Sequence, residues 1–237
     1  MLLLFDIDGT LLVGGTEAHR DAILESLRVV HGVDKPVRGP LAVAGRTDLD
    51  IAREILLLSG VSAQRIDARA DDVRIAACEA YARLMPDDLS HCVAPGIDEL
   101  LANLAVREGI VLGLVTGNFQ PIARMKLRAA KIGQYFAGGQ GGFGSDHEDR
   151  SELPAIARRR AGEADGEPWP RERTIVIGDT PRDIACARAD GVRVVGISTG
   201  PFPVEELRAA DAVARDAREL GSVLGRWLSA DGVLWSG

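Results

Sequence analysis

Two aspartates, Asp6 and Asp8, interrupt the apolar stretch MLLLFDIDGTLL at the beginning of the chain. Moving an ionised carboxylate out of water costs several kcal/mol unless another group compensates for it. A second carboxylate within ~4–6 Å adds repulsion, because like charges resist joint ionisation. Either this segment is not a buried strand, or a cation meets its two carboxylates.

Two later apolar runs also end in polar residues. The triplet TGN (116–118) follows one of them, and the triplet GDT (178–180) follows another, with Asp183 close behind. If these runs are parallel strands, their carboxyl ends meet at one edge of a sheet, where such folds bind ligands. The four aspartates of these segments cannot all stay ionised in one crevice without a cation. A few hard oxygen ligands with room for water suit Mg²⁺.

Short apolar runs alternate with helical patterns over most of the chain, which predicts a doubly wound α/β fold with helices on both faces of a parallel sheet. The predicted strands span residues 2–6, 109–118, 173–180 and 191–200. The predicted helices span residues 96–107, 120–131, 151–162 and 182–189. A further strand is expected near 137–144, and the tail (211–228) is expected to supply a short strand, DAVA, and a closing helix.

The segment between residues 14 and 84 departs from this alternation and carries only helical patterns, with helix start and stop signals. Inserted directly after the first strand, it would lie above the carboxyl edge of the sheet, in the position of a lid. We therefore predict an α/β core formed by residues 1–13 and 89–237, and a helical cap formed by residues 14–88.

The composition is that of a globular protein, with 46% hydrophobic and 27% charged residues among 237. The formal net charge of −7 argues against nucleic acid or anionic membranes as partners, because both attract basic surfaces. No run approaches the ~18 consecutive apolar residues that suggest a membrane span. Three widely spaced cysteines predict a reducing compartment. We expect a cytoplasmic protein, either a monomer or a homodimer, that acts on a small molecule.

The motifs DIDGT (6–10), TGN (116–118) and GDTPRD (178–183), in this order, resemble three of the four signatures of the haloacid dehalogenase superfamily. The resemblance covers nearly the whole chain, and the helical block matches the position of the family's inserted cap. It implies a Rossmann-like core and a Mg²⁺-dependent phosphatase that hydrolyses a small phosphate monoester through an aspartyl-phosphate. By resemblance alone, phosphoglycolate or a similar phosphorylated metabolite is the expected class of substrate.

The resemblance also implies a role for each matching residue. The nucleophile would be Asp6, and the acid and base would be Asp8. The metal would be held by the Asp6 and Asp179 carboxylates and the Asp8 backbone carbonyl, with Asp183 as a further ligand or a supporting group. The phosphate-binding residues would be Thr116, Gly117 and Asn118. Taken alone, the triplet would equally suit an ordinary turn, and Asp183 would suit a helix N-terminus.

The fourth signature is a Lys or Arg ahead of the last acidic motif, and here the sequence reads HEDRSELPAIARRR. We predict that Arg150 fills this role, with Ser151 capping the helix that follows. The alternatives are the arginines at 158–160, which fall within the helix and are expected to face solvent.

The motif AGRTD (44–48) resembles a substrate loop of the family's caps, which implies that Arg46 and Thr47 contact the substrate. Thr47 could also be a helix N-cap, with Asp50 completing an imperfect capping box, and both roles can hold together. Phe119 is expected to lie in the core. No role is assigned to the histidines, which show no metal-ligand spacing: His19, His31, His91 and His147.

Three other activities are open on this evidence. A carbon–halogen hydrolase shares the fold and the nucleophile, but it does not need Asp8, because a halide leaves without a proton. A phosphosugar mutase would re-phosphorylate its product and would not release phosphate. A receiver-like signalling module also gathers acids, a threonine and Mg²⁺ at the edge of a parallel sheet, but it needs no helical insert of about 70 residues.

Overall fold

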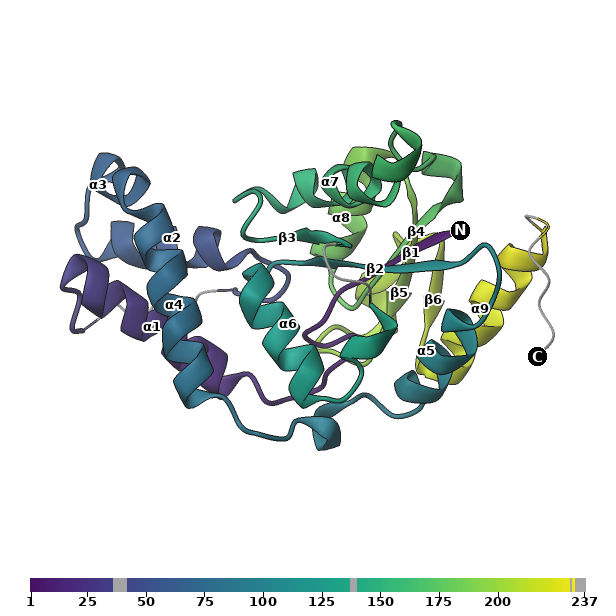
Figure 1. Cartoon of the computed structure of the whole chain (residues 1–237), viewed down its shortest axis with the longest axis horizontal. Helices are drawn as coiled ribbons and strands as arrows, with labels where there is room; N and C mark the ends of the chain where they lie inside the picture. Colours follow the sequence, from purple (N-terminus) through teal and green to yellow (C-terminus); the bar gives the residue numbers. More distant parts are fainter. Residues whose placement is uncertain (36–41, 137–139, 231, 233–237) are drawn as a thin grey trace.

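The computed structural model describes residues 1–237 except 36–41, 137–139, 231 and 233–237, and its centre is a six-stranded parallel sheet (Figure 1). The strand order is β3-β2-β1-β4-β5-β6. The strands are β1 (Leu2–Phe5), β2 (Val111–Thr116), β3 (Gly142–Phe143), β4 (Thr174–Gly178), β5 (Arg193–Ile197) and β6 (Ala212–Ala214). This arrangement confirms the predicted doubly wound α/β fold.

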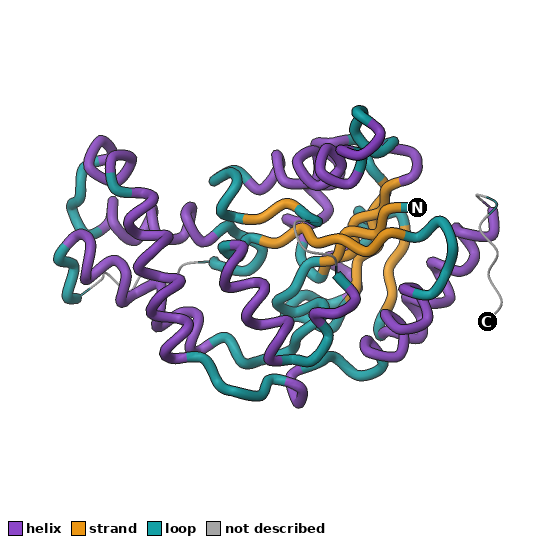
Figure 2. Tube along the Cα trace, viewed as in Figure 1, coloured by secondary structure: helices purple, strands orange, loops and turns teal. Residues whose placement is uncertain are grey.

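Helices cover both faces of the sheet, as the buried apolar strands require (Figure 2). Side chains alternate along β1: Leu3 and Phe5 pack with α5, α6 and α9, whereas Leu2 and Leu4 pack with α7 and α8. The bounds of these helices are α5 (Ile97–Ala105), α6 (Gln120–Ala129), α7 (Leu153–Ala161), α8 (Pro181–Asp190) and α9 (Ala217–Ala230).

The register of the central strands brings their carboxyl ends together. Phe5 of β1 lies opposite Leu114 of β2 on one side and Ile177 of β4 on the other. The next residue, Asp6, continues the strand pattern, because its backbone N–H donates to the Ile177 carbonyl at 2.9 Å. Asp6 therefore emerges between the end of β2 and the end of β4, at the edge that the sequence motifs share.

Of the α-helices described between β1 and β2 in the chain, the first four lie to one side of the sheet (Figure 1). They are α1 (Glu17–His31), α2 (Asp48–Leu58), α3 (Ala63–Ala68) and α4 (Ala70–Leu84), and we call them the helical insert. Their apolar faces form a cluster of their own, in which Leu27, Leu56 and Tyr81 are fully buried. Phe119 and Ile122, from the start of α6, complete it. The residue bounds of a separate cap domain, 14–88, stay a prediction.

The helical insert is held to the loops at the edge of the sheet by hydrogen bonds and by close backbone packing. The Asp48 N–H donates to the Gly117 carbonyl at 2.8 Å, and the Thr47 hydroxyl donates to the Glu148 carbonyl at 2.6 Å. A Cβ at Gly117 would lie 1.9 Å from the Arg46 carbonyl oxygen, so only glycine permits this approach. The start of α2 and the end of β2 therefore form a single packed unit.

Several local predictions can be compared with the structure. The tail supplies the predicted strand and helix, β6 and α9. The strand expected near 137–144 is reduced to β3, and residues 137–139 lie outside the described residues. In the described residues no helix is long and apolar enough to cross a membrane.

Two predictions around α7 are wrong. Ser151 does not cap a helix; it lies in a 3-10 turn (Arg150–Glu152), and the carboxylate of Asp149 caps that turn by accepting from the Ser151 N–H at 2.9 Å. Arg158 does not face solvent. It is buried and pairs with Asp190 of α8, Nε to Oδ2 at 2.6 Å.

Phe119→Ala should lower the free energy of unfolding by about 3–5 kcal/mol, because it opens a cavity where α6 meets the helical insert. Urea titration followed by circular dichroism measures this loss. Val106→Ala is the control: Val106 is 84% exposed, and its loss should stay within about 0.5 kcal/mol. Equal losses in the two variants would contradict the packing described here.

Candidate active site

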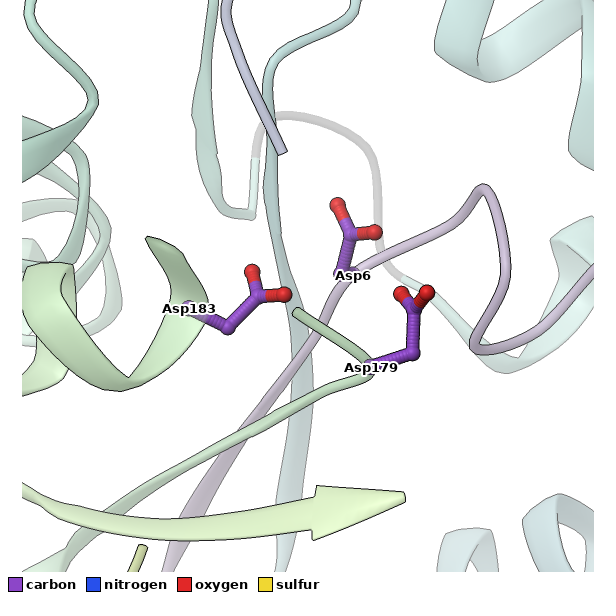
Figure 3. A group of neighbouring side chains, drawn as sticks. All are labelled: Asp6, Asp179 and Asp183. Carbon is purple, nitrogen blue, oxygen red and sulfur yellow. The ribbon is translucent and has the colours of Figure 1, made fainter. Parts of the chain in front are cut away.

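Three buried aspartates gather where β1 and β4 end, and their carboxylates lie beside one another (Figure 3). One carboxylate oxygen from each of Asp6, Asp179 and Asp183 lies within 4.8 Å of the other two. Asp6 follows β1, Asp179 follows β4, and Asp183 lies in the first turn of α8. The parallel register produces this cluster, because it brings the ends of strands that are far apart in the sequence side by side.

Arg150 supplies a positive charge to this cluster. Its Nη2 donates to Asp6 Oδ1 at 2.9 Å and also to Asp183 Oδ1, and the guanidinium is buried. Burial opposes the charge, but Asp183 and Asp6 together hold the pKa of Arg150 well above its ordinary value. Among the candidates for the fourth signature, Arg158 and Arg160 pair elsewhere, with Asp190 and Asp146.

One guanidinium does not neutralise three carboxylates, and the pKa values reflect this. Burial, together with the charges of Asp183 and Asp8, raises the pKa of Asp6 to about 7 in spite of Arg150. Burial and the charges of Asp6 and Asp183 raise the pKa of Asp179 to about 8. A protein that needs both groups ionised near neutral pH must bring a further cation to them.

The residues fit a divalent metal ion. Asp179 Oδ2 is buried and has no hydrogen-bond partner in the described residues, although Thr10 donates to Oδ1 at 3.1 Å. A Cβ on Gly9 would lie 2.2 Å from that Oδ2, so the loop approaches it without a side chain. The donors are hard oxygens, which suit Mg²⁺.

Asp183 is better placed to support than to ligate. Its Oδ2 accepts from the Thr180 N–H at 2.9 Å and from the Thr180 hydroxyl at 2.7 Å, as part of a capping box at the start of α8. Its Oδ1 accepts from Arg150. Both oxygens therefore have partners within the protein, so this carboxylate holds Arg150 and anchors the helix.

Asp8 is not part of this cluster of three aspartates, and its carboxylate has partners of its own. Both of its carboxylate oxygens lie 2.7 Å from Lys126 Nζ, and Oδ2 also accepts from Asn118 Nδ2 at 2.8 Å. Burial acts to raise the pKa of Asp8, but the Lys126 ammonium and these hydrogen bonds bring it below its ordinary value. Asp8 thus pairs with a cation of its own, Lys126, whereas Asp6 pairs with Arg150.

Lys126 and His19 were missed in the sequence. His19 Nδ1 lies 3.0 Å from Lys126 Nζ, and His19 Nε2 lies 3.0 Å from Asp48 Oδ2. The available signal was periodicity: Lys126 is four residues after Ile122 on the apolar face of α6, and His19 is four before Ile23 on that of α1. A charged residue at helical spacing within an apolar face predicts a buried partner.

The remaining predicted site residues lie around the cluster. Thr116 is fully buried at the end of β2, and its hydroxyl accepts from the Asn118 N–H at 3.3 Å. Thr47 caps α2 as predicted, accepting from the Asp50 N–H at 3.2 Å. Arg46 is held by carboxylates of α2: its Nε donates to Asp50 at 2.6 Å, and it also pairs with Glu54. The roles of all these residues toward a ligand stay predictions.

A cavity of about 510 Å³ opens beside Arg150, between the helical insert and the core. Arg46 and Thr47 line it from the insert, whereas Arg150 and Arg182 line it from the core. A cavity with converging polar groups is a common location for a small ligand.

Residues 3–188 match the family of haloacid dehalogenase-like hydrolases. The chain therefore belongs to this family, and both the predicted family and the predicted class of hydrolase are confirmed. A phosphoglycolate phosphatase of Rhodospirillum rubrum is 32% identical over 231 residues, which cover 94% of this chain and 90% of that protein. A probable phosphatase of Dickeya dadantii, IndB, is 26% identical over 213 residues, covering 89% of this chain and 86% of that protein.

Solved structures agree on the fold. CbbY from Rhodobacter sphaeroides, crystallised with phosphate, superimposes with a TM-score of 0.65 at 24% identity, covering 93% of this chain and 96% of that one. A predicted phosphatase from Clostridium acetobutylicum gives a TM-score of 0.64 at 20% identity, covering 94% and 97%.

Mg²⁺ should stabilise the protein more at pH 8 than at pH 5. The pKa values of Asp6 and Asp179 lie above the ordinary value of 3.8, so between pH 3.8 and pH 8 the folded metal-free protein holds protons that the unfolded chain has lost. Their contribution to stability therefore falls as the pH rises through this range. A cation reverses the loss, by about 2.7 kcal/mol at a hundred times its dissociation constant.

Thermal unfolding with EDTA and with Mg²⁺ at both pH values measures this difference. Asp179→Asn is the matched variant: it should lose the response to Mg²⁺ and, at pH 8 in EDTA, unfold at a higher temperature than the unmodified protein, because one buried charge is gone. An equal Mg²⁺ effect at both pH values would contradict the assignment.

Proposed function

We propose that this protein is a Mg²⁺-dependent phosphatase that hydrolyses a small phosphate monoester in two steps through an aspartyl-phosphate on Asp6. The observation that carries the proposal is a buried set of charged residues at the carboxyl edge of the sheet: Asp6, Asp179, Asp183 and Arg150. Asp8 follows Asp6 by two residues in the same loop. Family membership and the phosphatase relatives support the same reaction class.

In the first step an Asp6 carboxylate oxygen attacks phosphorus, and the bond from phosphorus to the ester oxygen breaks. The departing alkoxide takes a proton from Asp8 and leaves as an alcohol. Asp8 is ionised in the resting site, because its pKa is lowered by Lys126. It takes up a proton from solvent before it acts as the acid, a gain that the negative charge of an incoming phosphate ester favours, and it returns a proton to solvent after the second step.

In the second step water attacks phosphorus of the aspartyl-phosphate while Asp8 accepts its proton. The bond from phosphorus to the Asp6 oxygen breaks, which releases inorganic phosphate and regenerates the carboxylate. The same residue thus serves as acid and then as base, so its carboxylate must face the reacting oxygen in both steps.

The metal would be held by Asp6 and Asp179 together with the backbone carbonyl of Asp8, and when bound it would neutralise charge on the phosphoryl oxygens. Arg150 fixes the Asp6 oxygen that it contacts, which leaves the other oxygen to attack. Phosphoryl transfer depends mainly on position and charge neutralisation, so these fixed groups suffice for the chemistry.

The substrate class rests on the phosphatase relatives and not on the charge of the cavity between insert and core. Three arginines line that cavity, but so do three carboxylates, Asp50, Glu148 and Asp149. The expected substrate is a small phosphate ester such as phosphoglycolate, the substrate that the name of the Rhodospirillum rubrum relative states. Substrate contacts by Arg46 and Thr47 belong to the proposal.

Two observations favour a phosphatase over the alternatives. Asp8 is held in place by Lys126 and Asn118, whereas a carbon–halogen hydrolase does not need a fixed acid at this position. The helical insert covers the edge of the sheet, which a receiver module leaves open. A mutase shares the first step, and only the fate of the phosphoryl group separates it from a phosphatase.

Asp6→Asn should lower the turnover of p-nitrophenyl phosphate with Mg²⁺ by at least about 10³-fold, because the amide cannot attack phosphorus. Release of inorganic phosphate is the measurement. Asp88→Asn, which alters an exposed aspartate that pairs with Lys131, is the control and should leave turnover unchanged.

Turnover retained in Asp6→Asn would reject the nucleophile. In the unmodified protein, phosphate should accumulate to many equivalents per chain. A phosphoprotein that persists without releasing phosphate would instead support the receiver module, and transfer to a second sugar phosphate without free phosphate would support the mutase.

A further inference from the structure

Lys126 is the most completely buried cation near the site, with 1% of its side chain exposed, and the reaction steps above do not use it. It projects from α6 toward the loop after β1, between the core and the helical insert. Burying an ammonium is costly unless its charge is paired and its hydrogen bonds are made. Its contacts therefore show what this position is built to hold.

Each N–H of the ammonium has an acceptor. Lys126 Nζ lies 2.7 Å from Asp8 Oδ1, 2.7 Å from Asp8 Oδ2 and 3.0 Å from His19 Nδ1. An ammonium has three donors and no acceptor, so this set satisfies it completely. If His19 Nδ1 accepts, the neutral ring carries its proton on Nε2, which can then donate to Asp48 Oδ2 at 3.0 Å.

The far end of this chain of hydrogen bonds is anchored to the backbone. Asp48 Oδ2 also accepts from the Phe119 N–H at 2.7 Å, at the beginning of α6, where a helix favours negative charge. The His19 ring packs edge to face on Tyr81, with ring centroids 5.8 Å apart. Asp48, His19 and Tyr81 belong to the helical insert, whereas Asp8 and Lys126 belong to the core.

We propose that Lys126 is a positioning residue that fixes the Asp8 carboxylate for proton transfer, and that His19, supplied by the helical insert, fixes Lys126. Asp8 needs such support because its side chain is 27% exposed and its other hydrogen-bond donor among the described residues is Asn118. Without Lys126 the carboxylate keeps one hydrogen bond and can rotate away from the reacting oxygen. This inference rests on the proposed function, since it gives Asp8 the role of acid and base.

The dependence of rate on the leaving group separates a positioning role from a merely structural one. 2,4-Dinitrophenolate leaves without a proton, whereas phenolate needs one in the transition state. Loss of an oriented acid therefore slows hydrolysis of phenyl phosphate and spares 2,4-dinitrophenyl phosphate. The parameter kcat/KM reports the first phosphoryl transfer, in which Asp8 acts as the acid, so it is measured with both esters and Mg²⁺.

Lys126→Met should lower kcat/KM for phenyl phosphate by about 10²-fold and for 2,4-dinitrophenyl phosphate by less than about threefold. Asp8→Asn, the reference, should show the same selectivity. His19→Leu should show it more weakly, with a loss of about tenfold for phenyl phosphate, because Lys126 keeps both contacts to Asp8. With 2,4-dinitrophenyl phosphate the Lys126 variant should release a burst of phenolate, since the base is also impaired in the second step.

Arg158→Met is the matched control. It also removes a buried cation paired with a carboxylate, Asp190, but it lies between α7 and α8 on the opposite face of the sheet. Any loss of activity in this variant should be equal for the two esters. If Lys126→Met does not fold, the selectivity of His19→Leu decides the question.

Equal losses for the two esters in Lys126→Met, or a gain in activity, would overturn the positioning role while leaving the phosphatase intact. If the unmodified protein hydrolyses neither ester, the proposed function fails first, and this inference fails with it.

Discussion

Three carboxylates and one guanidinium share a buried space at the ends of β1 and β4, and the negative charge there exceeds the positive. The sheet imposes this arrangement, because parallel register places Asp6 beside the end of β4. The excess of charge appears as raised pKa values of Asp6 and Asp179 and as a buried Asp179 oxygen without a partner in the described residues. In the proposed function, a cation offsets this excess of negative charge and then helps to hold the substrate.

The two cations near the site, Arg150 and Lys126, contact different aspartates of the DIDGT motif. Arg150 bridges Asp6 and Asp183, so it orients Asp6, the proposed nucleophile, from the side of α8. Lys126 contacts both oxygens of Asp8 from the side of α6. The helices that carry or anchor these groups cover opposite faces of the sheet, and the two aspartates of one motif are thereby held by different layers of the fold. Their environments push the pKa values in opposite directions, upward for Asp6 and downward for Asp8. In the proposed reaction the nucleophile must be ionised and the acid protonated, so a cation at Asp6 and the negative charge of the substrate near Asp8 have to shift both pKa values back.

The sequence was sufficient for several features that depend on local pattern, although the capping role predicted for Ser151 was wrong. The apolar runs that end in aspartate predicted the sheet and its functional edge, and Thr47 was identified as a helix cap from its neighbours alone. Prediction failed where the partner is remote. Lys126 lies 118 residues from Asp8 and 107 from His19, and no spacing rule connects them. Arg158 was assigned to solvent because Asp190, 32 residues away, cannot be inferred as its partner from helix periodicity. Ser151 lost the capping role to Asp149, since two adjacent polar residues compete for the same turn.

The helical insert does more than cover the site, because its residues also contact groups of the site. Asp48 at the start of α2 accepts from His19 Nε2 and from the backbone at the start of α6, while its own N–H bonds to the carbonyl of Gly117. Asp48 of the insert therefore contacts both the loop that follows β2 and the chain of hydrogen bonds that runs through His19 and Lys126 to Asp8. A displacement of the insert would break these contacts together, because they converge on one short segment. In the proposed reaction, the position of the insert that excludes water is then also the position in which His19 holds Lys126, whereas a displaced insert leaves Asp8 with only its core contacts, Lys126 and Asn118.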